Sequence, residues 1–233
     1  DNSNTFILKE PALIDYTLGG NDYDINSSNW KFCFSINPIN NRIYSVMYHH
    51  QLLMIDPNAA EVKQIVSDLG FDTGSDVYTA FNPKEQNILY LSVTNNHSIY
   101  RVDLNQPSPV AIPYAGLACK KTGIQTASEF AYADGTLTQS RFSYPRQITF
   151  DKEGIMYIAD CVNHCIRSID TKTGIVSTFA GKGGEKGYVN GSASEARFSY
   201  PMGIAIGGDG AIYVADTRNS SIRKIYTSNS QSQ

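Results

Sequence analysis

Short runs of alternating hydrophobic and polar residues, each bounded by turn-forming residues, follow one another along the chain. Between residues 147 and 180 the pattern predicts four strands, at 147–150, 155–159, 165–169 and 175–180. Short turns rich in Asp, Asn, Thr and Gly separate them, and Gly181 ends the last one. Because strands joined by tight turns pair antiparallel, this unit predicts one four-stranded antiparallel sheet.

A block of sequence recurs at a spacing of 56 residues. The string RFSYP stands at 141–145 and again at 197–201, and GIMYIAD at 154–160 matches GAIYVAD at 210–216. Fainter copies occur upstream, so that four units each have a tyrosine in the second strand: Tyr44, Tyr90, Tyr157 and Tyr213. These tyrosines are 46, 67 and 56 residues apart, so the strands are regular while the connections vary in length.

Four antiparallel strands per repeat are typical of a propeller blade. The sequence predicts an all-β fold, a β-propeller of four-stranded antiparallel blades, as one domain over residues 1–233. The blades are expected at about 29–74, 75–141, 142–197 and 198–227. The last unit has three strands and then a polar tail, whereas residues 12–18, before Gly19-Gly20, have the pattern of an isolated fourth strand. Residues 1–28 are therefore expected to close the ring or to precede it.

The turn between the second and third strands carries a recognisable motif. YVADTRNSSIR at 213–223 resembles the NHL-repeat signature, and residues 157–167 are a second copy. The resemblance is strong over 142–227 and weaker upstream. The long connections after Gly116 and Gly181 resemble those of Bacteroidetes surface propellers, in which an immunoglobulin-like IPT/TIG domain often precedes the NHL repeats.

This resemblance implies a bacterial protein that is secreted, displayed on the cell surface or periplasmic, with an IPT/TIG-like domain as a neighbour outside these residues. It also implies a propeller that usually has six blades. Two interpretations of the ring follow: either residues 12–18 close a four-bladed ring, or the four units are a fragment or variant of a six-bladed design. The second is preferred because six is the usual number in the family.

Charge and cysteine content exclude several function classes. The net charge is −3, and Lys and Arg are scattered singly, so a nucleic-acid partner is not expected. No run approaches the ~18–20 apolar residues of a membrane span. The four cysteines, Cys33, Cys119, Cys161 and Cys165, lack the spacing of a zinc site. Cys161 and Cys165 are expected to be half-buried free thiols rather than a disulfide.

The histidines all fall in turns between second and third strands: His49, His50, His97 and His164. Imidazole is a common metal ligand, but equivalent positions on neighbouring blades are expected to lie too far apart to converge at the ~2.0–2.1 Å of a metal bond. The histidines are therefore predicted to be exposed turn residues with local hydrogen bonds. Neither a metal nor another cofactor is expected.

Two charged positions recur once per blade. Asp160 and Asp216 end second strands, and Arg167 and Arg223 lie in the third strands that follow. Because they repeat, a structural role is favoured over a catalytic carboxylate pair. The aspartates are predicted to cap their own turns, and the arginines to hydrogen-bond between blades.

Candidate ligand-binding residues lie mainly in the long connections: Tyr132, Asp134, Arg141 and Tyr144, with their copies Tyr188, Asn190, Arg197 and Tyr200. Aromatic rings beside arginine, amide and carboxylate groups suit sugars, whose C–H faces stack on rings while their hydroxyls are hydrogen-bonded. The repetition favours the alternative that these side chains pack each connection onto the next blade. Arg146 and Gln147 differ from their copies, Met202 and Gly203, and are candidates for specificity.

Three functions remain open. The preferred one is a non-enzymatic binding or scaffolding propeller that recognises a glycan or a protein on the face where the long connections and second turns open. One alternative is a metal-dependent propeller enzyme, a lyase or a lactonase-like hydrolase. Such relatives bind metal at the central channel, where no histidine is predicted here, and no catalytic residue is assigned. The other alternative is a structural assembly module.

Overall fold

The computed structural model describes residues 33–47, 50–59, 61–71, 75–85, 87–116 and 131–226. In this part of the chain the regular structure is β-strand, apart from two short 3-10 turns, η1 (Thr94–Asn96) and η2 (Thr217–Asn219). The strands form four antiparallel sheets. The all-β, four-stranded antiparallel architecture predicted from the sequence is thus confirmed.

The first two sheets come from the less regular half of the sequence. The first contains, in order, β1 (Cys33–Ile36), β2 (Ile43–Val46), β3 (Leu52–Asp56) and β4 (Glu61–Val66). The second contains β5 (Val77–Phe81), β6 (Ile88–Val93), β7 (Ser98–Asp103) and β8 (Ala111–Ala115).

The other two sheets come from the 56-residue repeat. The third contains β10 (Pro145–Phe150), β11 (Ile155–Asp160), β12 (Cys165–Asp170), β13 (Ile175–Ala180) and then the short β9 (Gly135–Thr136). The fourth contains β14 (Pro201–Ile206), β15 (Ile212–Asp216) and β16 (Ser221–Ile225). The four strands predicted between 147 and 180 are confirmed, with ends that differ by two residues at most.

The connection before β10 belongs with the sheet that follows it. β9 pairs with the outer edge of β13, placing Gly135 opposite Val176, and Ala133 bridges Arg141. The third sheet therefore begins before residue 142. The fourth sheet has three strands among the described residues, as expected. The strand predicted at residues 12–18 lies outside the described residues, as does the closing role of residues 1–28.

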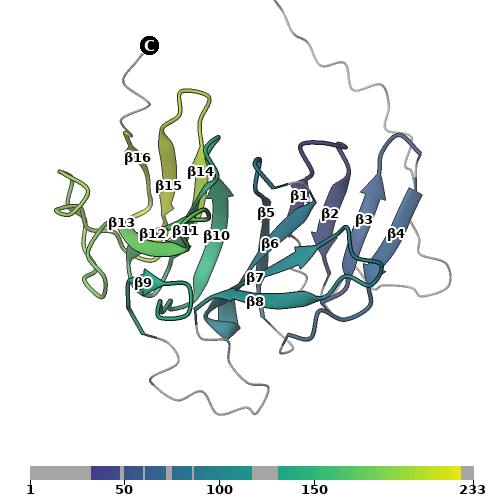
Figure 1. The fold of residues 1–233 in the computed structure, drawn as a ribbon. Coiled ribbons are helices and arrows are strands. Elements are labelled where there is room, and N and C mark those ends of the chain that lie inside the picture. Colours follow the sequence, from purple (N-terminus) through teal and green to yellow (C-terminus); the bar gives the residue numbers. More distant parts are fainter. Residues whose placement is uncertain are drawn as a thin grey trace, which may run out of the picture.

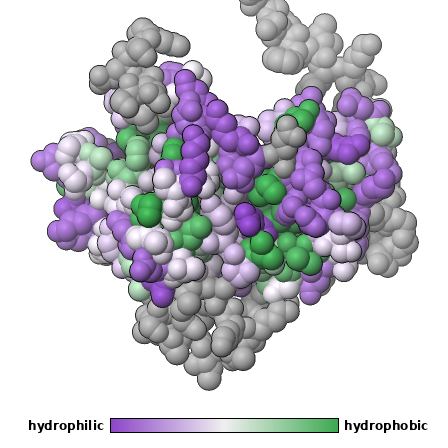
Figure 2. Space-filling model, viewed as in Figure 1, coloured by the Kyte–Doolittle hydropathy of each residue, from purple (hydrophilic) through white to green (hydrophobic). Residues whose placement is uncertain are grey.

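The sheets pack face to face in chain order and form an arc (Figure 1). First strands contact in sequence, β1 with β5, β5 with β10 and β10 with β14. A buried apolar cluster fills each interface, so the core is three layers between blades rather than one centre. On the outside, apolar residues show as separate small areas among polar ones (Figure 2).

Phe142 and Phe198 come from the connections and seal two of these layers. Phe142 packs with Tyr90 and Ile99 of the second sheet and with Ile148 of the third, and it is fully buried. Phe198 occupies the same place between the third and fourth sheets. Each connection thus contributes its own wedge to the interface in front of its blade.

The cysteines differ from the sequence prediction in burial. Cys33, Cys161 and Cys165 are free thiols, as expected. Cys161 and Cys165 are fully buried rather than half-buried, because the β11–β12 turn packs under the following connection. Burial raises the pKa of both thiols.

We predict that Gly181 tolerates no side chain. Its φ is +94°, and an added Cβ would lie 3.1 Å from the Cys165 Cα. Gly184 has φ +81° with no described atom within 4 Å, and Gly208 has neither restraint. Urea denaturation should show Gly184→Ala losing about 1–2 kcal/mol from backbone strain, Gly181→Ala losing more, and Gly208→Ala changing by less than about 0.5 kcal/mol. Equal losses at Gly181 and Gly184 would contradict the tight packing.

Candidate functional site

A buried guanidinium organises each of the two regular blades. The side chains of Arg167 and Asp160 are completely buried, and Arg167 Nη1 donates to Asp160 Oδ2 at 2.8 Å. Asp160 also accepts hydrogen bonds from the Ser143 backbone N–H, at 2.8 Å, and from the Asn163 amide, at 2.9 Å. The ion pair therefore has donors on both carboxylate oxygens, as a buried charge requires.

The same guanidinium fastens the preceding connection to the sheet. Arg167 Nη1 donates to the Arg141 carbonyl at 2.8 Å, and Nη2 donates to the Ala133 carbonyl and the Asp134 carboxylate, both at 2.6 Å. Its flat faces lie over the rings of Tyr132, at 4.9 Å, and Phe142, at 5.1 Å. We call this arrangement the arginine clamp.

The fourth sheet repeats the arginine clamp. Arg223 bonds Asp216 at 3.0 Å, the Arg197 carbonyl at 3.1 Å and the Asn190 side-chain oxygen at 2.7 Å. Tyr188 and Phe198 lie over its two faces. Asn190 thus replaces Asp134, and the rest of the contact set is kept.

The roles expected for these charged residues need two corrections. Asp160 accepts a backbone N–H from the preceding connection, Ser143, rather than from its own turn, which it reaches through the Asn163 side chain. Arg167 bonds within its own repeat unit rather than between blades, because residues 133–141 fold back onto that sheet. Burial raises the pKa of the Asp160 carboxyl, and the Arg167 guanidinium opposes that shift.

The structure places six candidate binding residues in or beside the arginine clamps. The Tyr132 hydroxyl bonds Thr178, and Asp134 accepts from the Thr178 backbone N–H at 3.1 Å. Arg141 and Arg197 each donate to carbonyl oxygens of their own connection, and Arg197 also pairs with Glu185. Tyr188 and Asn190 contact Arg223. These side chains hold the connections in place.

Tyr144 and Tyr200 lie elsewhere, on the face formed by the β11–β12 and η2 turns. Both have left-handed backbones, with φ of 50° and 52°. The Tyr144 N–H donates to His97 Nδ1 at 3.0 Å, and the Tyr200 N–H to His164 Nδ1 at 3.3 Å. Each tyrosine ring meets its histidine edge-on at 4.5 Å. Each histidine thus comes from the preceding blade and fixes the next tyrosine.

This arrangement corrects the prediction that the histidines are exposed. His50, His97 and His164 are all buried, and all have left-handed backbones at the same position of the second turn. His49 lies outside the described residues. The second turns are covered by the connection entering the next blade, and His97 and His164 are hydrogen-bond acceptors between blades.

Arg146 and Gln147 make contacts that the other repeat lacks. Arg146 Nη1 pairs with Asp76 at 2.5 Å and bonds the Tyr78 hydroxyl at 3.2 Å, which links the second and third sheets. Its Nε is buried without a hydrogen-bond partner among the described residues. Gln147 is exposed and accepts from the Ile204 N–H at 3.3 Å, toward the fourth sheet.

Sequence reasoning missed Arg218, which is exposed and stacks on the Tyr200 ring at 3.9 Å. The other repeat has Val162 at this position. The comparison of copies that singled out Arg146 would have found it. Both guanidiniums act against the rise that burial causes in the Cys161 pKa, which places Arg146 and Arg218 around one thiol. Asp76 and Tyr78 were missed because the weak upstream repeat carries no matching signal.

Within the described ranges, no group of three or more His, Cys, Asp and Glu side chains could hold a metal ion. No helix in this part of the chain has the length and apolar character needed to cross a membrane.

We predict that Asp160→Asn lowers the free energy of unfolding by about 3–5 kcal/mol, because it leaves a buried guanidinium without its counter-charge. Asp216→Asn in the last blade is the matched control. It should lose less, since Arg223 is partly reached by solvent. Urea denaturation measures both, and a loss below about 1 kcal/mol for Asp160→Asn would refute the importance of the pair.

We also predict an acid-sensitive stability from His164. Burial lowers the pKa of His164 below its ordinary value of 6.5. The unfolded chain then binds the proton more strongly, so stability is full above pH 6.5 and falls as the pH drops toward the lowered pKa. His164→Asn keeps an acceptor and tolerates the left-handed backbone. The slope of unfolding free energy between about pH 7 and 5 should be shallower in this variant; an unchanged slope would assign the effect to other groups.

Two kinds of relative match parts of this chain. NHL repeat-containing protein 2 of Bos taurus is 36% identical over 96 residues, which are 40% of this chain and 13% of that protein. An auxiliary nutrient binding protein of Bacteroides thetaiotaomicron is 28% identical over 82% of this chain and 46% of its own, with a TM-score of 0.68. A Bacteroides ovatus protein described in the same words is 26% identical over 84% of this chain and 48% of its own, with a TM-score of 0.69. The chain spans less than half of the length of each.

Family models agree with the repeat structure. The NHL repeat matches residues 198–225, which include the three strands of the last sheet. The Teneurin NHL domain matches residues 47–188, more than half of the chain. With four antiparallel sheets packed in series behind them, these matches show that the chain belongs to the Teneurin NHL domain family of NHL-repeat propellers.

Proposed function

We propose that this chain is a non-enzymatic binding propeller that recognises a glycan on the face carrying Tyr144, Tyr200, Arg146 and Arg218. The carrying observation is that both tyrosines are partly exposed yet held by a left-handed backbone and a buried histidine. A ring fixed in this way loses little conformational entropy on binding.

The chemistry of this face fits sugars. Tyrosine rings offer flat apolar surface for pyranose C–H faces, and guanidinium groups donate several hydrogen bonds to hydroxyl or carboxylate oxygens. The exposed Arg218 side chain lies over a ring, so that its donors can be reached by a ligand from solvent. Tyr144 and Tyr200 immediately precede strands of adjacent blades, β10 and β14, which contact each other, so one oligosaccharide can span both.

The relatives support the same class of function. The two Bacteroides proteins are described as auxiliary nutrient binding proteins, and they resemble this chain over most of its length. By extension we propose a secreted, cell-surface or periplasmic location. These relatives are also about twice as long as this chain, which leaves room for a further domain, and we propose an IPT/TIG-like one as the neighbour.

The test is binding to a panel of purified polysaccharides by glycan array, followed by calorimetry on any that bind. Tyr144→Ala with Tyr200→Ala should weaken binding about tenfold or more, because each ring contact is worth about 0.5–1.5 kcal/mol. Arg218→Gln should weaken it further.

The control is Val110→Ala, which removes exposed apolar surface next to β8, away from this face. Absence of any bound glycan would refute the proposal, and so would an affinity that the tyrosine double variant leaves unchanged. Binding of protein ligands alone would move the function to protein recognition.

A further inference from the structure

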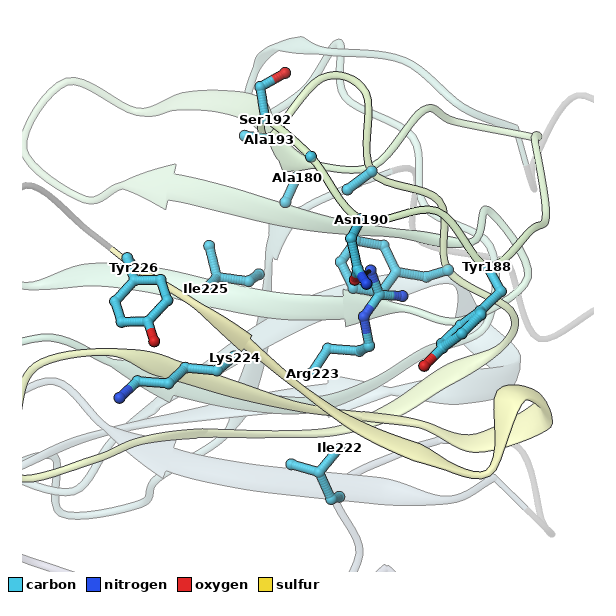
Figure 3. Close-up of a pocket in the computed structure, with 13 residues that line it drawn as sticks. Ala180, Tyr188, Asn190, Ser192, Ala193, Ile222, Arg223, Lys224, Ile225 and Tyr226 are labelled. Atoms are coloured by element: carbon cyan, nitrogen blue, oxygen red, sulfur yellow. Dashed lines mark hydrogen bonds between the residues drawn. The ribbon is translucent and has the colours of Figure 1, made fainter.

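The outer edge of β16 borders a hollow where its counterpart in the third sheet has a paired strand. A cavity of about 550 Å³ runs beside β16, lined on one side by Arg223, Ile225 and Tyr226 and on the other by Tyr188 and Ala193 (Figure 3). A second cavity of about 560 Å³ continues from it toward the β14–β15 turn and shares Ala193, Ile225 and Tyr226. We call the two together the edge groove.

The third sheet shows what belongs in this place. There β13 lies along β12, so that Ile169 pairs with Val176 and Ser168 with Ser177. The connection holds β13 from outside, through Asp134 to the Thr178 N–H and through β9. In the fourth sheet the equivalent connection residues, Tyr188 and Asn190, stand in position beside β16 (Figure 3). The edge groove is therefore a fourth-strand position with its clamp already formed.

Fourth strands in this protein end on a required glycine. Ala115-Gly116 ends β8 and Ala180-Gly181 ends β13, with glycine φ of +84° and +94°. An added Cβ at Gly116 would come within 2.9 Å of the His97 carbonyl. A segment that fits the edge groove should therefore be a strand of alternating pattern that stops at glycine.

We propose that the edge groove is filled by residues 13–19 of this same chain, in the register of 175–181. Aligned on Gly19 and Gly181, Ile14 takes the place of Val176, Asp15 that of Ser177 and Leu18 that of Ala180. By the pairing of β12 with β13, these three residues fall opposite Ile225, Lys224 and Ile222. The proposal concerns how the blade is completed and is independent of the glycan proposal.

The partners in this register match in polarity and size. Asp15 opposes Lys224, and Ile14 opposes Ile225. The groove is wider than its counterpart because Ala193 stands where the third sheet has Leu137, which packs in the same cluster as Val176. Isoleucine in place of valine fills part of that added space. Leu18 would cover Ile222, which is 70% exposed whereas its equivalent Ile166 is 0% exposed.

The chain is long enough to make this connection. The residues from Gly20 to Phe32, 13 in number, separate the segment from β1. Extended, they reach about 45 Å, more than twice the roughly 17 Å radius of gyration expected for a domain of this length. An intramolecular strand also meets its groove at high effective concentration, which favours it over a second copy.

The test is a disulfide between Asp15→Cys and Lys224→Cys, made in the full chain with Cys33→Ser and Cys119→Ser to remove other accessible thiols. Ser168 and Ser177 occupy the equivalent paired positions, and Lys224 is exposed, so folding should be retained; circular dichroism checks this. Under oxidised glutathione most molecules should lose two hydrogens by mass and yield a cross-linked peptide that joins positions 15 and 224, while staying monomeric by size.

The matched control pairs Asp15→Cys with Lys63→Cys, an exposed position on β4, the outer strand of another blade. It should not cross-link. Adding Ile14→Asp to the test pair should reduce cross-linking at least tenfold. A folded test pair that stays reduced, or one that cross-links equally at Lys63, would overturn the proposal. A disulfide-linked dimer would overturn it in favour of a second copy in the edge groove.

Discussion

The buried ion pair at the end of the second strand is the constraint on which each regular blade depends. A guanidinium placed in an apolar layer between sheets is strongly unfavourable unless its charge and donors are met by acceptors. Arg167 meets this requirement with Asp160, two backbone carbonyls and Asp134, and the acceptors can be supplied only if residues 133–141 fold back onto the sheet. The charge therefore dictates the path of the connection. The connection in turn inserts Phe142 between blades and positions Tyr144 at the entrance of β10.

Much of the fold follows from sequence because the repeat reports the same physical solution twice. Alternation and turn residues located the strands between 147 and 180 to within two residues. The repetition of Asp160 and Arg167 was enough to assign them structural roles, but it could not reveal their partners. The partners depend on the direction in which the connection folds, which is a tertiary property. The histidines were misassigned for a similar reason: turn composition indicates exposure, whereas the next connection covers them.

The candidate site divides along the same line. Tyr132, Asp134 and Arg141, with their copies, are chemically suited to a ligand, but their hydrogen-bonding groups are directed at the protein itself. Tyr144 and Tyr200 expose their rings, because the histidines take up their backbone N–H groups. Arg146, Arg218 and Gln147 vary between copies. Variation within a repeat therefore indicated surface chemistry more reliably than the repeated residues did, since repeated side chains serve the scaffold.

The arginine clamp closes within one repeat rather than between two. Its guanidinium, carboxylate, connection and aromatic rings all lie within one 56-residue period of sequence, so a unit carries every polar contact that its buried charge needs. What passes between neighbouring units is mainly apolar packing and a backbone N–H to a histidine, both of which any copy can offer to the next. A tandem duplication or deletion of the underlying gene segment would then add or remove a whole blade without leaving a buried charge unpaired. Blade number in such a protein is free to drift in evolution, while the interior of each blade is not.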